Sequence, residues 1–294
     1  MYMKKLLFLI VGSFFTAALL SYTFKVPEPS FRSPECYIRC YETDVRSQFK
    51  QEAAMVEFAL LHENPVPFIL ENPTGKNITF TSPDGMDGMA YEIRSKKKTN
   101  NFLLVVHEWY GLNDYIKQEA EMLSKELGNM NVIALDLYDG KVADNRDSAM
   151  KYVQAVKNDR LENIIKAAIA YAGPGAKIFT IGWCFGGMWS LQASILAGKQ
   201  GAGGIMYYGR PETNTEKLKM LNGDIIGFFG NQDQSPSPAM VDEFEKKMAE
   251  TGKTLVTNKY EAGHGFANPS NPSFNKAAKE DAHKKTIEFL KSRM

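Results

Sequence analysis

The chain has 294 residues, of which 44% are hydrophobic and 23% are charged, a balance that excludes a disordered chain and a polytopic membrane protein. Its 35 Lys and Arg residues against 34 Asp and Glu give a net charge of +1, so no overall field would attract nucleic acid or an acidic membrane surface. The three cysteines are too few for a disulfide scaffold.

Residues 1–22 have the pattern of a targeting segment. Lys4 and Lys5 precede an apolar run at 6–20, which is shorter than the about 20 residues of a membrane span and is typical of a secretory signal. We therefore expect an exported protein, periplasmic or secreted, and the alternative is a retained N-terminal anchor. Residues 23–75 would form an N-terminal extension, in which Cys36 and Cys40 are either a disulfide or two free thiols.

The extension is expected to contain one amphipathic helix. Phe49, Ala53, Val56 and Leu60 recur at helical spacing, with charged residues between them. We expect this helix to pack on the main body and to carry no chemistry.

From residue 76 onward, short apolar runs alternate with amphipathic stretches. The runs expected to form strands are 102–106, 132–135, 178–181, 204–208, 225–229 and 254–260. The stretches expected to form helices are 114–127, 161–171, 185–197, 238–249 and 276–291. This alternation predicts one α/β domain over residues 76–294, with a mostly parallel, doubly wound sheet and helices on both faces. Reactive groups in such sheets gather at the carboxyl edge.

A motif typical of a catalytic nucleophile follows the expected strand at 178–181. The sequence GWCFG at 182–186 has the G-x-S-x-G pattern with cysteine in place of serine. A sharp strand-to-helix turn projects its middle side chain and needs small neighbours, which Gly182 and Gly186 provide. The N-terminus of the following helix would also favour a thiolate. We predict that Cys184 is a nucleophile, and the alternative is a buried structural cysteine.

A nucleophilic cysteine needs a general base, which is normally a histidine. Of the four histidines, His62 lies in the extension, outside the α/β body, and His283 lies among charged residues of a predicted helix. His107 ends an early strand and is the main competitor. His264 lies in a glycine-flanked loop before the last helix, where folds with this type of turn place their histidine, so we predict that it is the base.

The acid that orients the base should lie between these two residues in the chain. Asp233 directly follows an apolar strand, whereas Asp224 precedes that strand and Asp242 lies inside the next helix. We predict that Asp233 accepts the imidazole N–H and fixes its tautomer.

With these residues in place, the sequence resembles the dienelactone hydrolase family over about residues 78–291. The motifs that carry the resemblance are, in chain order, HEWYGLN at 107–113, GWCFGG at 182–187, GNQD at 230–233 and AGHGF at 262–266. The resemblance implies the α/β-hydrolase fold and supports a Cys184, His264 and Asp233 triad.

The resemblance also implies roles outside the triad. Glu108 would stand beside the resting thiol and keep it neutral until substrate arrives. The backbone N–H groups of Trp109 and Phe185 would form the oxyanion hole.

For substrate binding, the resemblance assigns Arg146 to a carboxylate of the substrate. Asn268 stands where the family has a second arginine, and Met150 stands where it has a tyrosine. We therefore expect weaker binding of a substrate carboxylate.

Together, these observations predict an exported, monomeric hydrolase of small-molecule esters, lactones or thioesters that works through an acyl-enzyme. No metal, organic cofactor or nucleic acid is expected. GAGG at 201–204 precedes a strand rather than a helix, so it is no phosphate loop. The alternatives are an amidase or peptidase with the same triad, and a non-catalytic binding protein on the same scaffold.

Overall fold

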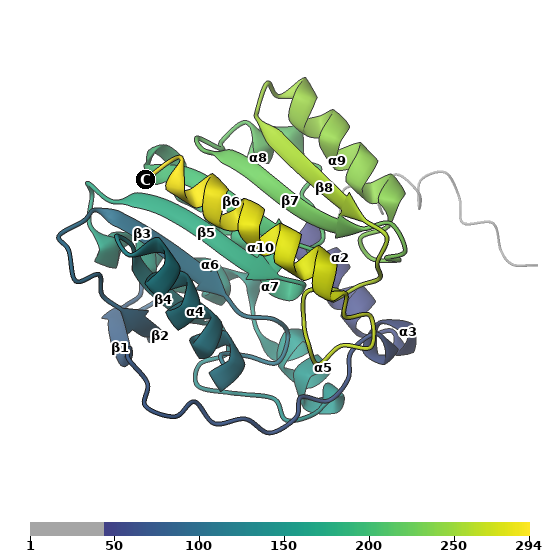
Figure 1. The fold of residues 1–294 in the computed structure, drawn as a ribbon, viewed down its shortest axis with the longest axis horizontal. Coiled ribbons are helices and arrows are strands. Elements are labelled where there is room, and N and C mark those ends of the chain that lie inside the picture. The colour runs from purple at the N-terminus through teal and green to yellow at the C-terminus, as the bar shows by residue number, and fades with distance from the viewer. Residues whose placement is uncertain (1–43) are drawn as a thin grey trace, which may run out of the picture. The chain divides into compact units, whose positions relative to one another are not determined.

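A single eight-stranded sheet forms the centre of the computed structural model, which describes residues 44–294 (Figure 1). The strands are β1 (Lys76–Thr81), β2 (Asp87–Ile93), β3 (Asn101–Val106), β4 (Asn131–Asp136), β5 (Lys177–Trp183), β6 (Gly201–Tyr207), β7 (Asp224–Gly230) and β8 (Leu255–Tyr260). Their order in the sheet is β1-β2-β4-β3-β5-β6-β7-β8. The expected targeting segment at residues 1–22 and the cysteines at 36 and 40 lie outside the described residues.

Most of the sheet is parallel, as predicted. The neighbours from β4 through β3, β5, β6 and β7 to β8 pair in parallel, whereas the β1–β2 and β2–β4 pairs are antiparallel. Strands β3 and β4 are buried along their whole length, because helices cover both faces of the sheet. This arrangement is the predicted α/β-hydrolase architecture with an added antiparallel edge.

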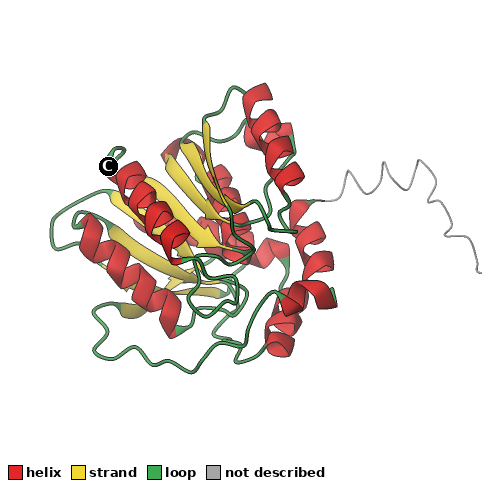
Figure 2. Ribbon diagram, turned by 45° about the vertical axis from the view of Figure 1, so that its right-hand side comes forward, coloured by secondary structure: helices red, strands yellow, loops and turns green. Residues whose placement is uncertain are grey.

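Helices cover the two faces of this sheet (Figure 2). They are α4 (Asp114–Leu127), α5 (Arg146–Ala155), α6 (Asn158–Ala172), α7 (Phe185–Leu196), α8 (Thr215–Leu218), α9 (Pro238–Glu250) and α10 (Lys276–Lys291), with a 3₁₀ turn at Gly198–Gln200. Helices α4 and α10 lie side by side over one face, and α6 and α7 lie over the other (Figure 1). None of the helices in the described part of the chain is long and apolar enough to cross a membrane.

Local sequence explains where these helices begin and end. In α4, the side chain of Asn113 caps the N-terminus by accepting from the N–H of Ile116, and Gly128 ends the helix at a φ of 68°. Buried positions recur along one face at helical spacing, which turns that face toward the sheet. These are Ile116, Ala120, Leu123 and Leu127.

The expected single helix in the extension is wrong, because the structure has two. Helix α2 spans Val45–Ala53 and α3 spans Val56–Leu60, with a turn between them. The apolar stripe is broken at this turn: Val56 and Leu60 are 68% and 65% exposed, and Phe58 is buried in their place. The reoriented helix brings Phe58 against the carboxyl edge of the sheet, where its ring packs on Trp109.

Candidate active site

Cys184 occupies a strained turn between β5 and α7. Its φ of 54° is unusual for a residue other than glycine and has a conformational cost of about 1–3 kcal/mol. A Cβ atom at Gly182 would lie 2.1 Å from the carbonyl oxygen of Gly186, and one at Gly186 would lie 2.2 Å from the carbonyl oxygen of Val106. The turn therefore has the predicted shape, and both glycines are required because no larger residue fits.

His264 and Asp233 meet at the same edge of the sheet, in the loops that follow β8 and β7. The Nδ1 of His264 lies 2.9 Å from Oδ2 of Asp233, and both side chains are buried. The other carboxylate oxygen of Asp233 accepts from the N–H of Ser235 at 2.8 Å. Burial lowers the pKa of His264, but the Asp233 carboxylate and the Cys184 sulfur outweigh burial and raise that pKa well above its usual value. The bond to Asp233 leaves Nε2 as the reactive nitrogen.

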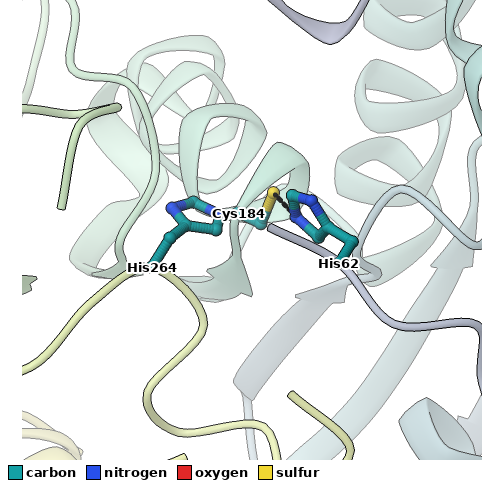
Figure 3. A group of neighbouring side chains, drawn as sticks. All are labelled: His62, Cys184 and His264. Atoms are coloured by element: carbon teal, nitrogen blue, oxygen red, sulfur yellow. Dashed lines mark hydrogen bonds between the residues drawn. The ribbon is translucent and has the colours of Figure 1, made fainter. Parts of the chain in front are cut away.

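The sulfur of Cys184 lies between two imidazoles, those of His62 and His264 (Figure 3). Sγ is 3.5 Å from Nε2 of His62, and on its other side it interacts with the ring of His264. The sulfur and one ring nitrogen from each histidine all lie within 4.8 Å of one another. Cys184 itself is only 1% exposed, and burial raises the pKa of its thiol by more than His264 lowers it.

The position of His62 corrects the prediction that the extension carries no chemistry. Its Nδ1 lies 2.9 Å from the carbonyl oxygen of Phe58. Burial, followed by the charge of His264, lowers the pKa of His62 to about 3, so the ring is neutral at pH 7. A neutral ring that donates from Nδ1 to Phe58 can only accept at Nε2, and the thiol of Cys184 therefore donates to it. Sequence reasoning missed His62, which lies just past the end of α3 and whose only local signal is its spacing of four residues from Phe58.

Glu108 favours the neutral thiol in the direction that the resemblance implied: burial raises the pKa of Cys184, and the charge of Glu108 adds to that rise. Its carboxylate accepts from Nδ2 of Asn268 at 2.8 Å and from the Tyr208 hydroxyl at 3.4 Å. In the described part of the chain no hydrogen bond joins Glu108 to Cys184, whose hydrogen-bond partner is His62. Burial raises the pKa of Glu108, and its charged and polar neighbours offset that rise only in part.

The two residues assigned to the oxyanion hole lie at the start of α7 and in the loop after β3. Phe185 begins α7, and its backbone N–H faces the sulfur and lowers the pKa of Cys184 by less than burial raises it. Trp109 follows Glu108 in the loop after β3, and its ring packs 4.5 Å from that of His62.

Arg146 begins α5 and is turned toward the extension. Its backbone N–H donates to Oδ1 of Asn64 at 3.0 Å, and its guanidinium donates to the carbonyl of Ala59 at 3.5 Å. Its positive charge contributes to the low pKa of His62. Met150, where the family has a tyrosine, is a partly buried residue packed against the main core.

Both ring nitrogens of His107, the competing base, are hydrogen-bonded to backbone groups. Its Nε2 accepts from the N–H of Leu137 at 3.1 Å, and its Nδ1 lies 2.5 Å from the carbonyl oxygen of Glu108. The ring is fully buried, so neither nitrogen is available to the thiol. His283 pairs with Glu126 at 2.9 Å on the helical face where it was predicted.

A cavity of about 250 Å³ begins beside this cluster and extends between α4 and α10. Near the thiol its walls include His62, Glu108, Tyr208 and Asn268. Between the helices, apolar side chains of α4 such as Ile116 face Lys279 and His283 of α10. Arg146 is not among the lining residues. The cavity has the size and mixed polarity expected of a site for a small organic molecule.

Comparisons with known proteins agree with this geometry. Residues 88–294 match the model of the Dienelactone hydrolase family. A putative carboxymethylenebutenolidase of Methylorubrum extorquens is 28% identical over 211 residues, which cover 64% of this chain and 71% of that protein. Carboxymethylenebutenolidase 1 of Cupriavidus pinatubonensis is 23% identical over 227 residues, covering 72% and 95%. The crystal structure of a putative dienelactone hydrolase from Klebsiella pneumoniae superposes with a TM-score of 0.63 at 19% identity, covering 74% and 98%.

Proposed function

Because this chain belongs to the dienelactone hydrolase family and is a hydrolase, we propose that it cleaves small carboxylic esters or lactones through an acyl-enzyme on Cys184. The observation that carries this proposal is the buried Asp233–His264 pair, whose imidazole interacts with a cysteine on a strained turn. These are the nucleophile, base and orienting acid of a triad, in the chain order of α/β-hydrolases.

The first half of the reaction transfers the acyl group to sulfur. The thiol proton passes to Nε2 of His264, and Sγ attacks the carbonyl carbon of the ester. The N–H groups of Phe185 and Trp109 would stabilise the oxyanion that forms. When the carbon–oxygen bond breaks, His264 returns the proton to the leaving oxygen, and a thioester to Cys184 remains.

The second half releases the acid. His264 takes a proton from water, the resulting hydroxide attacks the thioester, and the sulfur leaves and recovers the proton. Asp233 keeps the Nδ1 proton in place throughout, so that Nε2 is always the nitrogen that exchanges protons. The Asp233 carboxylate also stabilises the imidazolium that His264 becomes when it takes the thiol proton.

The resting hydrogen bond from Cys184 to His62 gives the buried thiol a neutral partner. In the first step the S–H group turns from His62 to His264 by rotation about the Cβ–Sγ bond. We propose this contact as the hydrogen bond of the resting thiol, which acts beside the charge of Glu108.

Hydrolysis assays on the full chain and on Cys184→Ala would test this proposal, with a dienelactone and a simple aryl ester as substrates. We expect turnover of the aryl ester to disappear in Cys184→Ala while circular dichroism stays unchanged. Full activity in that variant would refute the assignment of the nucleophile. If the wild-type protein hydrolyses neither substrate and reacts with no other acyl donor, the result would favour a non-catalytic binding protein. Faster cleavage of matched amides would favour a peptidase.

The role of Arg146 is a separate part of the proposal. If its guanidinium binds a substrate carboxylate, Arg146→Gln raises KM for the anionic dienelactone and leaves KM for a neutral aryl ester unchanged. An equal change for both substrates would contradict a role in anion binding.

We also propose that the hydrolase is exported, since residues 1–22 combine a basic start with a short apolar run. N-terminal sequencing of the protein from its native host tests this, and an intact N-terminus on a cytoplasmic protein would contradict it.

A further inference from the structure

Two imidazoles and a thiol point toward one small volume at the active site (Figure 3). We propose that His62, Cys184 and His264 form a site for a thiophilic divalent metal ion, with Zn²⁺ as the ion that the donor set fits. One sulfur and two imidazole nitrogens are ligands that zinc prefers, and three protein ligands leave the fourth tetrahedral position to water.

The hydrogen bonds around the two histidines favour this proposal. Histidine ligands nearly always donate their second ring N–H to a carboxylate or a backbone carbonyl, which fixes the tautomer and turns the other nitrogen toward the metal. His264 donates from Nδ1 to Asp233, and His62 donates from Nδ1 to the carbonyl of Phe58. Both Nε2 lone pairs are thereby directed toward Cys184.

The spacing of the donor atoms is close to that of a zinc site. Zinc–nitrogen and zinc–sulfur bonds of about 2.0 and 2.3 Å at a tetrahedral angle separate the two ligand atoms by about 3.6 Å. The Sγ of Cys184 and Nε2 of His62 are 3.5 Å apart, and no pair in the cluster exceeds 4.8 Å. A shift of about 1 Å in the third ligand, within the reach of a side-chain rotation, would complete the site.

The ring of His264 is oriented toward the same point. It is 3% exposed, and the Cys184 sulfur is its partner on the Nε2 side. A metal ion bound between the two would replace this contact with a bond to each ligand. The cavity lined by His62 and Glu108 borders the cluster, and the carboxylate of Glu108 brings negative charge to the same wall.

Binding would replace the thiol proton: Zn²⁺ forms a bond to Sγ and to each Nε2, and the proton of Cys184 is released to solvent. Because the ion would occupy both the nucleophile and the base, it would block the hydrolysis proposed above. That consequence rests on the proposed function, whereas metal binding itself does not.

Cobalt and zinc titrations of the full chain, treated with chelator and kept reduced, test the site without measuring activity. Co²⁺ should give the visible bands of a tetrahedral complex and a thiolate-to-metal charge-transfer band, with one ion bound per chain. Zn²⁺ should displace it, as measured by competition with a chromophoric chelator. Cys184→Ser should lose the charge-transfer band.

His62→Gln is the decisive variant, and His283→Gln is its matched control, since His283 lines the same cavity between α4 and α10 and pairs there with Glu126. Loss of a second-sphere hydrogen bond costs a zinc site about 10- to 100-fold in affinity, so we expect loss of the His62 ligand to cost at least about 100-fold. His283→Gln should bind as the wild type does. A wild type without the charge-transfer band, or an unchanged affinity in folded His62→Gln, would overturn the proposal. If His62→Gln does not fold, an unchanged spectrum in Cys184→Ser would overturn it instead.

Discussion

Replacing Asp233 by asparagine should remove most of the activity without changing the shape of the site. In the structure one carboxylate oxygen accepts from the backbone N–H of Ser235 at 2.8 Å, and the other lies 2.9 Å from Nδ1 of His264. The N–H of Ser235 will hold the amide oxygen of the new asparagine, so its NH₂ group must face His264. The imidazole would then have to accept at Nδ1 and carry its proton on Nε2.

This reversed tautomer cannot take the proton of Cys184, and the imidazolium also loses its neighbouring negative charge. The same exchange in a serine triad reduces kcat by about 10⁴-fold, which corresponds to about 5.4 kcal/mol of transition-state stabilisation. We expect a reduction of about 10³- to 10⁴-fold for Asp233→Asn, because both partners here are buried and solvent does not supply a substitute.

The measurement is kcat for an aryl ester at neutral pH, together with unfolding by urea. Asp242→Asn is the matched control, since Asp242 lies on the exposed side of α9 and pairs with Lys259. It should keep wild-type kcat and stability, because exposed ion pairs contribute little. A value of kcat within tenfold of the wild type in Asp233→Asn would show that the orientation of His264 does not control the reaction.

Further predictions concern the fold around the site. Gly182→Ala places a Cβ against Gly186 and should destabilise the protein by several kcal/mol or prevent folding. Gly175→Ala is the control: a Cβ there meets nothing within 4 Å, so the urea midpoint should change little. Phe58→Ala should cost about 3–5 kcal/mol in urea unfolding, as is typical for a buried phenylalanine; a cost below 1 kcal/mol would contradict the packing of α3 on the site. His62 has a folded pKa of about 3 against 6.5 unfolded, so the unfolded chain binds the proton more tightly and stability falls as pH drops from about 6.5 toward 3. Between pH 7 and pH 5 the wild type should lose about 2 kcal/mol more than His62→Gln, and an equal loss in both would refute a buried neutral His62.

The sequence was most informative where chemistry and burial coincide. Strands β3 to β7 are buried by helices, and strands of this kind appear in the sequence as continuous apolar segments. The cysteine motif identified the nucleophile, and the chain order of the strands predicted Asp233 and His264 at the same edge of the sheet. In the structure Oδ2 of Asp233 lies 2.9 Å from Nδ1 of His264.

The remaining parts depended on contacts that local pattern does not encode. Strand β1 has one buried residue, Phe80, and its polar alternation gave no apolar run to detect. Helix α5 was missed because only Ala149 and Val153 along it are buried, leaving a weak apolar face. The two helices of the extension were read as one because Val56 and Leu60 continued the stripe, although both face solvent.

The position of His62 in the site could not be predicted from local sequence pattern either. It is separated from Cys184 by 122 positions and belongs to a segment outside the repeating strands and helices. Its place is determined by tertiary packing, in which Phe58 and Trp109 enclose the imidazole at 4.6 and 4.5 Å between ring centres. No spacing rule of the α/β body predicts such a contact.

Formation of a covalent acyl-enzyme is the most direct test of the central claim. The full chain would be mixed with an activated aryl ester, quenched in acid within the first turnovers, and examined by intact mass and peptide mapping. We expect one acyl group on the peptide that contains Cys184, with no adduct in Cys184→Ala. Release of product by the wild type without any adduct on this peptide, or an adduct on another residue that persists in Cys184→Ala, would contradict the proposed mechanism.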